Sequence, residues 1–100
     1  MSMTHELINV TSSTADVTSS TIYPQRHGDE SGSYQISVTA GTAVKVQIFG
    51  RLGENHAWHQ VAIAENITAT ATADITIYPQ MYVFLDADST SSTTVVSIME

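Results

Sequence analysis

The feature that most constrains the fold of this chain is an alternation of apolar and polar side chains with a period of two. In residues 34–39 the apolar side chains of Tyr34, Ile36 and Val38 alternate with polar ones, and residues 44–48 repeat the pattern. Successive side chains of a strand point to opposite faces of a sheet, so this pattern indicates strands with one buried face. No stretch longer than ten residues shows a helical period, so we predict little or no helix.

The same argument predicts strands along most of the chain, at residues 6–10, 17–23, 58–64, 73–77, 81–85 and 95–99. Ala40-Gly41-Thr42 predicts a hairpin turn between the strands at 34–39 and 44–48, and Gly50 and Gly53 bracket a second turn or bulge. Residues 86–94 are rich in Asp, Ser and Thr and predict a polar connection within a C-terminal strand pair.

Seven or eight short strands predict an all-β domain, either a small antiparallel β-sandwich or a jelly-roll-like barrel. We expect one domain over residues 1–100, in which residues 1–15 form either an extended N-terminal arm or part of a strand.

A five-residue phrase occurs twice in the chain. Thr-Ile-Tyr-Pro-Gln stands at residues 21–25 and again at 76–80, each time after a Thr-rich segment. Proline cannot donate to a sheet ladder, so each Tyr-Pro is expected to end a strand at a corner. Two interpretations remain open: reuse of a good strand-ending phrase, or two similar β-units related by internal pseudo-symmetry.

Charge and composition exclude several partners. The formal net charge is −7 with three basic residues, a balance that repels nucleic-acid phosphates and anionic lipids. No apolar run approaches the roughly 18 residues that a membrane span needs, and the N-terminus does not have the pattern of a signal peptide. We therefore expect no nucleic-acid or membrane partner and synthesis in the cytoplasm. The chain has no cysteine, which excludes disulfides and thiolate metal sites.

The chemical motifs of the chain do not predict an enzyme. His56 and His59 are three residues apart and would point to opposite faces of a strand. The acidic segment at Asp86 and Asp88 begins like a calcium loop but has neither the central glycine nor the closing glutamate. We expect no metal, no cofactor and no catalytic residue. Trp58 is expected either in the core or on a binding surface.

The C-terminal segments carry apolar side chains on both faces, which one sheet face in the core cannot cover. From this pattern we name as interface candidates Tyr82, Phe84, Val95, Met99 and Trp58. We expect a second subunit to cover them.

The stretch from Ser37 to Leu52, followed by Trp58, resembles the small β-proteins encoded in the structural modules of tailed bacteriophages, of the capsid decoration or cement type. The shared features are a Gly-Thr hairpin, an alternating Val/Gln strand, a glycine, a Trp-bearing strand and a C-terminal strand pair. The resemblance covers residues 33–99. It implies a structural protein on the capsid surface of a virion, which binds the major capsid protein and forms a homo-oligomer, with a homotrimer as the expected form. A carbohydrate-binding or adhesin-like β-module, with Trp58 and the tyrosines as a sugar platform, is the alternative, and a tail or baseplate component is a further one.

Overall fold

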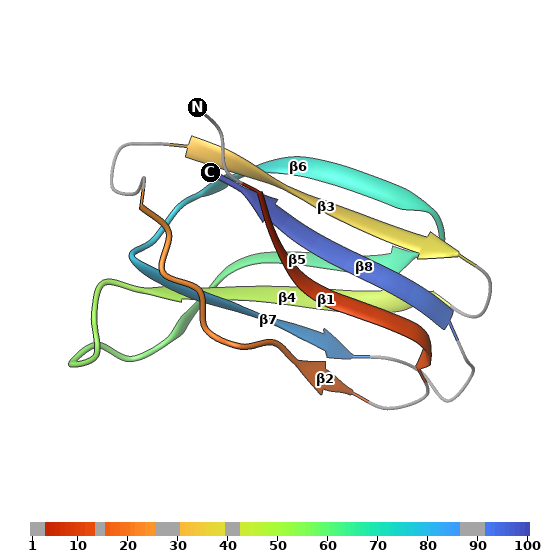
Figure 1. Cartoon of the computed structure of the whole chain (residues 1–100), viewed down its shortest axis with the longest axis horizontal. Helices are drawn as coiled ribbons and strands as arrows, with labels where there is room; N and C mark the ends of the chain where they lie inside the picture. The colour runs from red at the N-terminus through yellow and green to blue at the C-terminus, as the bar shows by residue number, and fades with distance from the viewer. Residues whose placement is uncertain (1–3, 14–15, 26–30, 40–42, 87–91) are drawn as a thin grey trace.

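The computed structural model describes residues 4–13, 16–25, 31–39, 43–86 and 92–100, and Figure 1 shows that these residues form strands in two layers. Strands hold 73% of the described residues, and none of these residues is helical. The strands are β1 (Thr4–Ser13), β2 (Val17–Thr18), β3 (Ser31–Thr39), β4 (Val44–Arg51), β5 (His59–Ile67), β6 (Thr70–Thr76), β7 (Gln80–Asp86) and β8 (Ser92–Met99). The prediction of an all-β domain with seven or eight strands is confirmed.

The strands form two four-stranded sheets that pack face to face. One has the order β1-β8-β3-β6 and the other β2-β7-β4-β5, and every paired neighbour is antiparallel. Among the described strands, β4 and β5 are the consecutive pair that hydrogen-bonds within one sheet, and every other connection passes between sheets. Eight strands crossing between two antiparallel sheets in this order form a jelly roll.

This topology has an internal two-fold equivalence. If each strand is replaced by the strand four places along the chain, counting cyclically, the order β1-β8-β3-β6 becomes β5-β4-β7-β2. This is the order of the second sheet, read from its other edge. The repeated phrase occupies equivalent places, since residues 21–25 follow β2 and lead toward β3 whereas residues 76–80 lead from β6 to β7. Ile22 of the first copy also forms a β-bridge with Met81, directly after the second copy. The topology therefore supports the interpretation as two similar units.

The core lies between the sheets and consists of the inward residues of each alternating strand. In β4 and β7 every second residue is buried, which confirms the alternation predicted for both segments. The buried apolar residues are Ile8, Ile36, Val38, Val44, Val46, Ile48, Ile75, Ile77, Met81, Val83, Leu85, Val96 and Ile98. Each side chain of this size contributes about 1.5–3 kcal/mol when fully buried, so this layer is the main source of stability.

One buried carboxylate ties three segments together at the end of β8. His5 Nε2 of β1 lies 2.5 Å from Glu100 Oε2, and the Gln25 backbone N–H donates to Glu100 Oε1 at 3.0 Å. The Glu100 side chain is 1% exposed. A buried carboxylate needs such partners, because an unpaired buried charge is costly.

The hairpin predicted at Ala40-Gly41-Thr42 is wrong. β3 pairs with β6 and β8, whereas β4 pairs with β5 and β7 in the other sheet. Residues 40–42 themselves lie outside the described part of the chain. Both strands have one buried face, as predicted, but those faces belong to opposite sheets and meet across the core.

The predicted C-terminal strand pair is wrong for the same reason. β7 lies in the second sheet and β8 in the first, and the chain order does not make them neighbours. The polar connection is also shorter than predicted, because β8 begins at Ser92 and Thr94 is fully buried in it. Residues 87–91 lie outside the described residues.

The N-terminal segment and β5 resolve two further predictions. Thr4–Ser13 pairs with β8 as an edge strand, so these residues belong to the sheet and are not an arm. In β5 a register shift occurs where Ile48 faces Ala62 and Phe49 faces Gln60. The intervening Val61 therefore packs against the core together with Ala62, which explains why the apolar alternation has no consistent phase in this strand.

Candidate binding face

The outer face of the sheet β2-β7-β4-β5 carries a group of large aromatic side chains. We call this surface the aromatic face and define it by Phe49, Trp58, Tyr82 and Phe84. Phe49 of β4 lies directly opposite Tyr82 of β7, and Gln47 lies opposite Phe84. These residues alternate with the core residues of the same strands, and therefore point away from the core. Each is half-buried.

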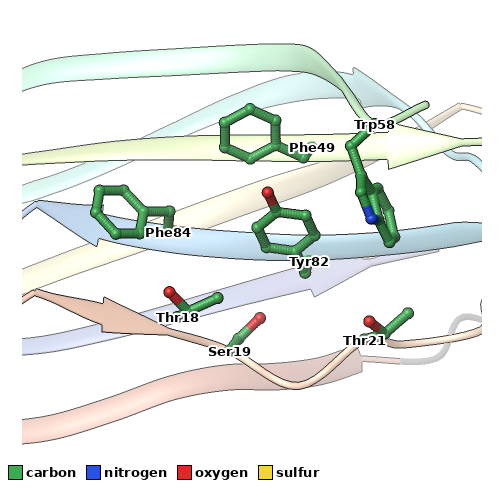
Figure 2. A pocket seen from close by; sticks show the side chains of 7 residues that line it. All are labelled: Thr18, Ser19, Thr21, Phe49, Trp58, Tyr82 and Phe84. Carbon is green, nitrogen blue, oxygen red and sulfur yellow. The ribbon is translucent and has the colours of Figure 1, made fainter.

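The rings of Phe49, Tyr82 and Phe84 form the floor of the aromatic face, and the Trp58 ring stands upright at one side of it as a wall. The Phe49 and Tyr82 ring centroids are 4.9 Å apart with 13° between the planes. Trp58 meets Tyr82 at 88°, with 4.7 Å between centroids. Figure 2 views the sheet face-on and shows the rings of Phe49, Tyr82 and Phe84 face-on as well, whereas Trp58 is seen edge-on. The three floor rings therefore lie roughly along the sheet.

Arg51 is held in place at the end of this face. Its Nε donates to Gln80 Oε1 at 2.6 Å, and its guanidinium carbon lies 4.2 Å from the centre of the Trp58 ring. A guanidinium over an indole gains cation–π energy and keeps most of its five N–H donors for other acceptors. Arg51 thus presents an oriented positive charge beside the aromatic floor.

A shallow groove crosses the aromatic face along the β2 edge. Its volume is about 480 Å³, and its lining consists of Thr18, Ser19, Thr21, Phe49, Trp58, Tyr82 and Phe84. Figure 2 shows the three hydroxyl side chains in a row beside the rings. Ser19 also accepts a hydrogen bond from the Val83 N–H at 2.8 Å, which fixes this edge to β7. Aromatic floor and hydroxyl rim together suit a ligand with both apolar and polar surface.

The opposite end of the aromatic face is acidic. Lys45 lies opposite Asp86 in the register, and Glu65 lines the same shallow depression as these two residues. Asp16 is exposed immediately before Val17, which pairs with Leu85 beside Asp86. This end therefore carries three carboxylates and one ammonium group. The face is therefore polarised along its strands, from Arg51 at one end to this acidic row at the other.

The outer face of the other sheet is chemically different. Its central row joins Thr72, Gln35 and Ser97 across three strands, and the next row joins Thr70, Ser37 and Val95. Hydroxyl and amide side chains of this kind can meet water without a partner. The two outer faces of the sandwich therefore differ, and one of them is aromatic.

The structure brings three of the five interface candidates together. Trp58, Tyr82 and Phe84 share the aromatic face, whereas Val95 and Met99 lie in β8 of the other sheet. Met99 is 42% exposed and lines a small depression with Ser33 and Thr72. The five candidates therefore form two separate surfaces.

Sequence reasoning missed Phe49 and Arg51. Both stand at outward positions of the alternation that β4 begins with Lys45 and Gln47. The alternation could have identified them, because Phe49 and Arg51 stand at odd positions of that strand and therefore face away from Val46 and Ile48.

The histidine pair and the acidic loop do not form a metal centre in the described residues. His56 is exposed in the turn after β4, and His59 packs against Tyr78 with 4.9 Å between ring centroids. The described part of the chain holds no group of three or more His, Asp or Glu side chains that could bind a metal. Asp88 lies outside the described residues.

Comparisons of this chain with protein-family models, with curated proteins and with solved structures found no match. In the described residues, no helix has the length and apolar character that crossing a membrane requires.

Proposed function

We propose that this protein is a structural protein of a tailed-phage head, a capsid decoration protein that acts by binding and carries out no reaction. Its assembly buries the aromatic face. One observation carries the proposal: the domain leaves four aromatic side chains half-buried on one outer face, while the opposite outer face is polar. A domain that bound no partner would not need two outer faces of different composition.

The composition of the face suits contact with a protein. Tyr, Trp and Arg are the residue types that dominate binding energy in interfaces, when packed centrally and shielded from water. Trp58 contacts both Tyr82 and Arg51, and Arg51 is already oriented by Gln80. Little side-chain entropy is then lost on binding, which favours affinity.

The resemblance to phage structural proteins points to the same surface. The stretch that carries it, from Ser37 to Leu52, contains β4, which supplies Phe49 and Arg51 to the aromatic face. Trp58, which follows that stretch in the resemblance, is the wall of the groove. The segment that resembles decoration proteins is therefore also the segment that builds the candidate binding surface.

The test is attachment to a particle. Virus particles from a culture that encodes this protein are purified by density-gradient sedimentation, and the protein is quantified by mass spectrometry. We expect it in stoichiometric amounts with the major capsid protein. Particles grown with Phe84→Asp should lose it, while the control Gln35→Asp on the polar face should not. A protein that remains at the top of the gradient in every case would refute the proposal.

A carbohydrate-binding module is the second candidate, and the flat floor of rings favours it. Sugar rings stack their C–H faces on aromatic rings, and the hydroxyls of Thr18 and Thr21 stand beside the floor. Trp58 is the sole tryptophan in the sequence, so its fluorescence reports on this groove. A saturable emission change with a soluble oligosaccharide, which Tyr82→Ala abolishes, would support this candidate over the decoration protein.

A further inference from the structure

We propose that the partner that covers the aromatic face is a second copy of this chain, docked face to face about a two-fold axis that runs across the strands. This inference rests on the proposed function, because it names the partner of the surface that assembly buries. The two-fold contact gives a dimer in place of the trimer expected from the sequence.

The polarity of the face sets the orientation of the second copy. Arg51 marks one end of β4, and Lys45 with Asp86 and Glu65 marks the other. A two-fold axis across the strands turns the second copy end for end, so that each Arg51 approaches the acidic row of its partner. An axis along the strands would instead bring the two acidic rows together, which like-charge repulsion disfavours.

The acidic row also suits the angle at which sheets pack. Asp86 on β7 and Glu65 on β5 flank Lys45 on both sides of β4. Aligned sheets cross at about 30°, which shifts the ends of facing strands by roughly one strand spacing. This shift places Arg51 of the second copy beside Asp86 or Glu65 instead of directly opposite Lys45, for either direction of the crossing angle.

The centre of this contact is apolar. Between the charged ends lie Phe49, Tyr82 and Phe84, with Ile63 of β5 opposite Gln47 and 40% exposed. Two such surfaces placed face to face exclude water from all of these side chains at once, and their charged ends fix the register.

The available area predicts a weak dimer. The four strands β2, β7, β4 and β5 hold 2, 7, 8 and 9 residues. At about 3.3 Å per residue and about 4.8 Å between strands, they give a face of about 400 Å². The pair then buries about 800 Å² in total, which is below the size of standard interfaces and in the range of weak contacts. We expect a dissociation constant in the micromolar range, and association that weakens as salt screens the ends.

Charge reversal tests the arrangement, by sedimentation equilibrium over about a thousandfold range of concentration around the micromolar. Arg51→Glu should raise the dissociation constant by about tenfold or more, because the new carboxylate meets the acidic row. Adding Glu65→Lys and Asp86→Lys to that variant should restore the dimer. Far-UV circular dichroism checks that each variant retains the β-sheet fold.

A matched control distinguishes an effect of the aromatic face on dimerisation from an effect of net charge. Arg51→Glu changes the formal charge from −7 to −9, and the double variant Gln35→Glu with Thr39→Glu on β3 makes the same change at exposed positions of the polar sheet. The control should dimerise like the wild type. A monomeric or trimeric wild type, a control that dissociates equally, or a triple variant without rescue would each overturn the two-fold contact. Attachment of the wild-type protein to particles does not depend on these outcomes, so the proposed function can stand if this contact fails.

Discussion

Replacing Gly50 by alanine should destabilise the domain through one identifiable contact. A Cβ atom built at Gly50 would lie 2.8 Å from Cγ and 2.9 Å from Cδ1 of Tyr78. Carbon atoms in contact prefer about 3.5–4.0 Å, so the ring would have to retreat by roughly 0.5–1 Å. His59 packs against Tyr78 with 4.9 Å between centroids, and Tyr78 is also packed against the core, so the retreat is resisted.

The expected loss of stability follows from two opposing terms. Overpacking of this kind costs about 1–3 kcal/mol. Removing a glycine from the unfolded chain returns about 0.4–1 kcal/mol. The net loss is therefore about 1–2 kcal/mol, which for a domain of this size lowers the melting temperature by roughly 4–15 °C.

The assay is urea denaturation followed by circular dichroism, with two comparisons. Gly53→Ala is the control, because its Cβ would lie 3.9 Å from the nearest atom, His56 Cδ2, and should cost little. In a Tyr78→Ala background the ring is removed and only the Cβ of residue 78 remains, 3.0 Å from the added atom, so the cost of Gly50→Ala should fall to a small part of its value. Equal losses in both backgrounds would refute the contact as the cause.

Four further substitutions test the core, the buried carboxylate and the two-sided β7 strand. Thr94 Oγ1 is buried and has no hydrogen-bond partner among the described residues, so Thr94→Val should leave stability unchanged or raise it by about 1 kcal/mol in a denaturant titration. Glu100→Ala removes the partner of His5 and should cost about 1–3 kcal/mol in the same titration, where an unchanged midpoint would contradict the assigned contacts. Val83→Asp should abolish the β-sheet spectrum because Val83 is fully buried, whereas Phe84→Asp should retain it, and an unfolded Phe84→Asp would place that ring in the core.

The alternation in the sequence predicts which residues are buried better than it predicts how the strands connect. Met81, Val83 and Leu85 were predicted on one face and are all fully buried. The apolar–polar alternation does not indicate which sheet a strand joins, because each sheet of a sandwich has one apolar face toward the same core. Ala40-Gly41-Thr42 therefore suits a hairpin and a crossing between sheets equally well as a short connection.

Part of the candidate site could be predicted, and the rest depends on the crossing topology. Tyr82 and Phe84 follow from the two-sided apolar pattern of β7. Val95 has the same kind of pattern but belongs to β8, which the jelly-roll order places in the other sheet. The link between Trp58 and Tyr82 arises because β5 and β7 flank β4, a neighbour relation that no local pattern records.

Because the fold contains equivalent strands, their residues can be compared to distinguish positions that the core requires to be apolar from positions that it does not constrain. β3 and β7 are equivalent strands, and both carry apolar residues inward, as packing demands. Their outward residues face no such demand, and they differ: β3 presents Gln35 and Ser37, whereas β7 presents Tyr82 and Phe84.

The same difference separates β8 from β4, where Ser97 of the first sheet contrasts with Phe49 of the second. If the jelly roll needed aromatic outer residues for its own stability, both sheets would carry them. The polar sheet is built on the same topology without them, so the topology itself does not require the aromatic face. Its side chains are therefore best explained by a partner, which is why substitutions there should alter binding far more than stability.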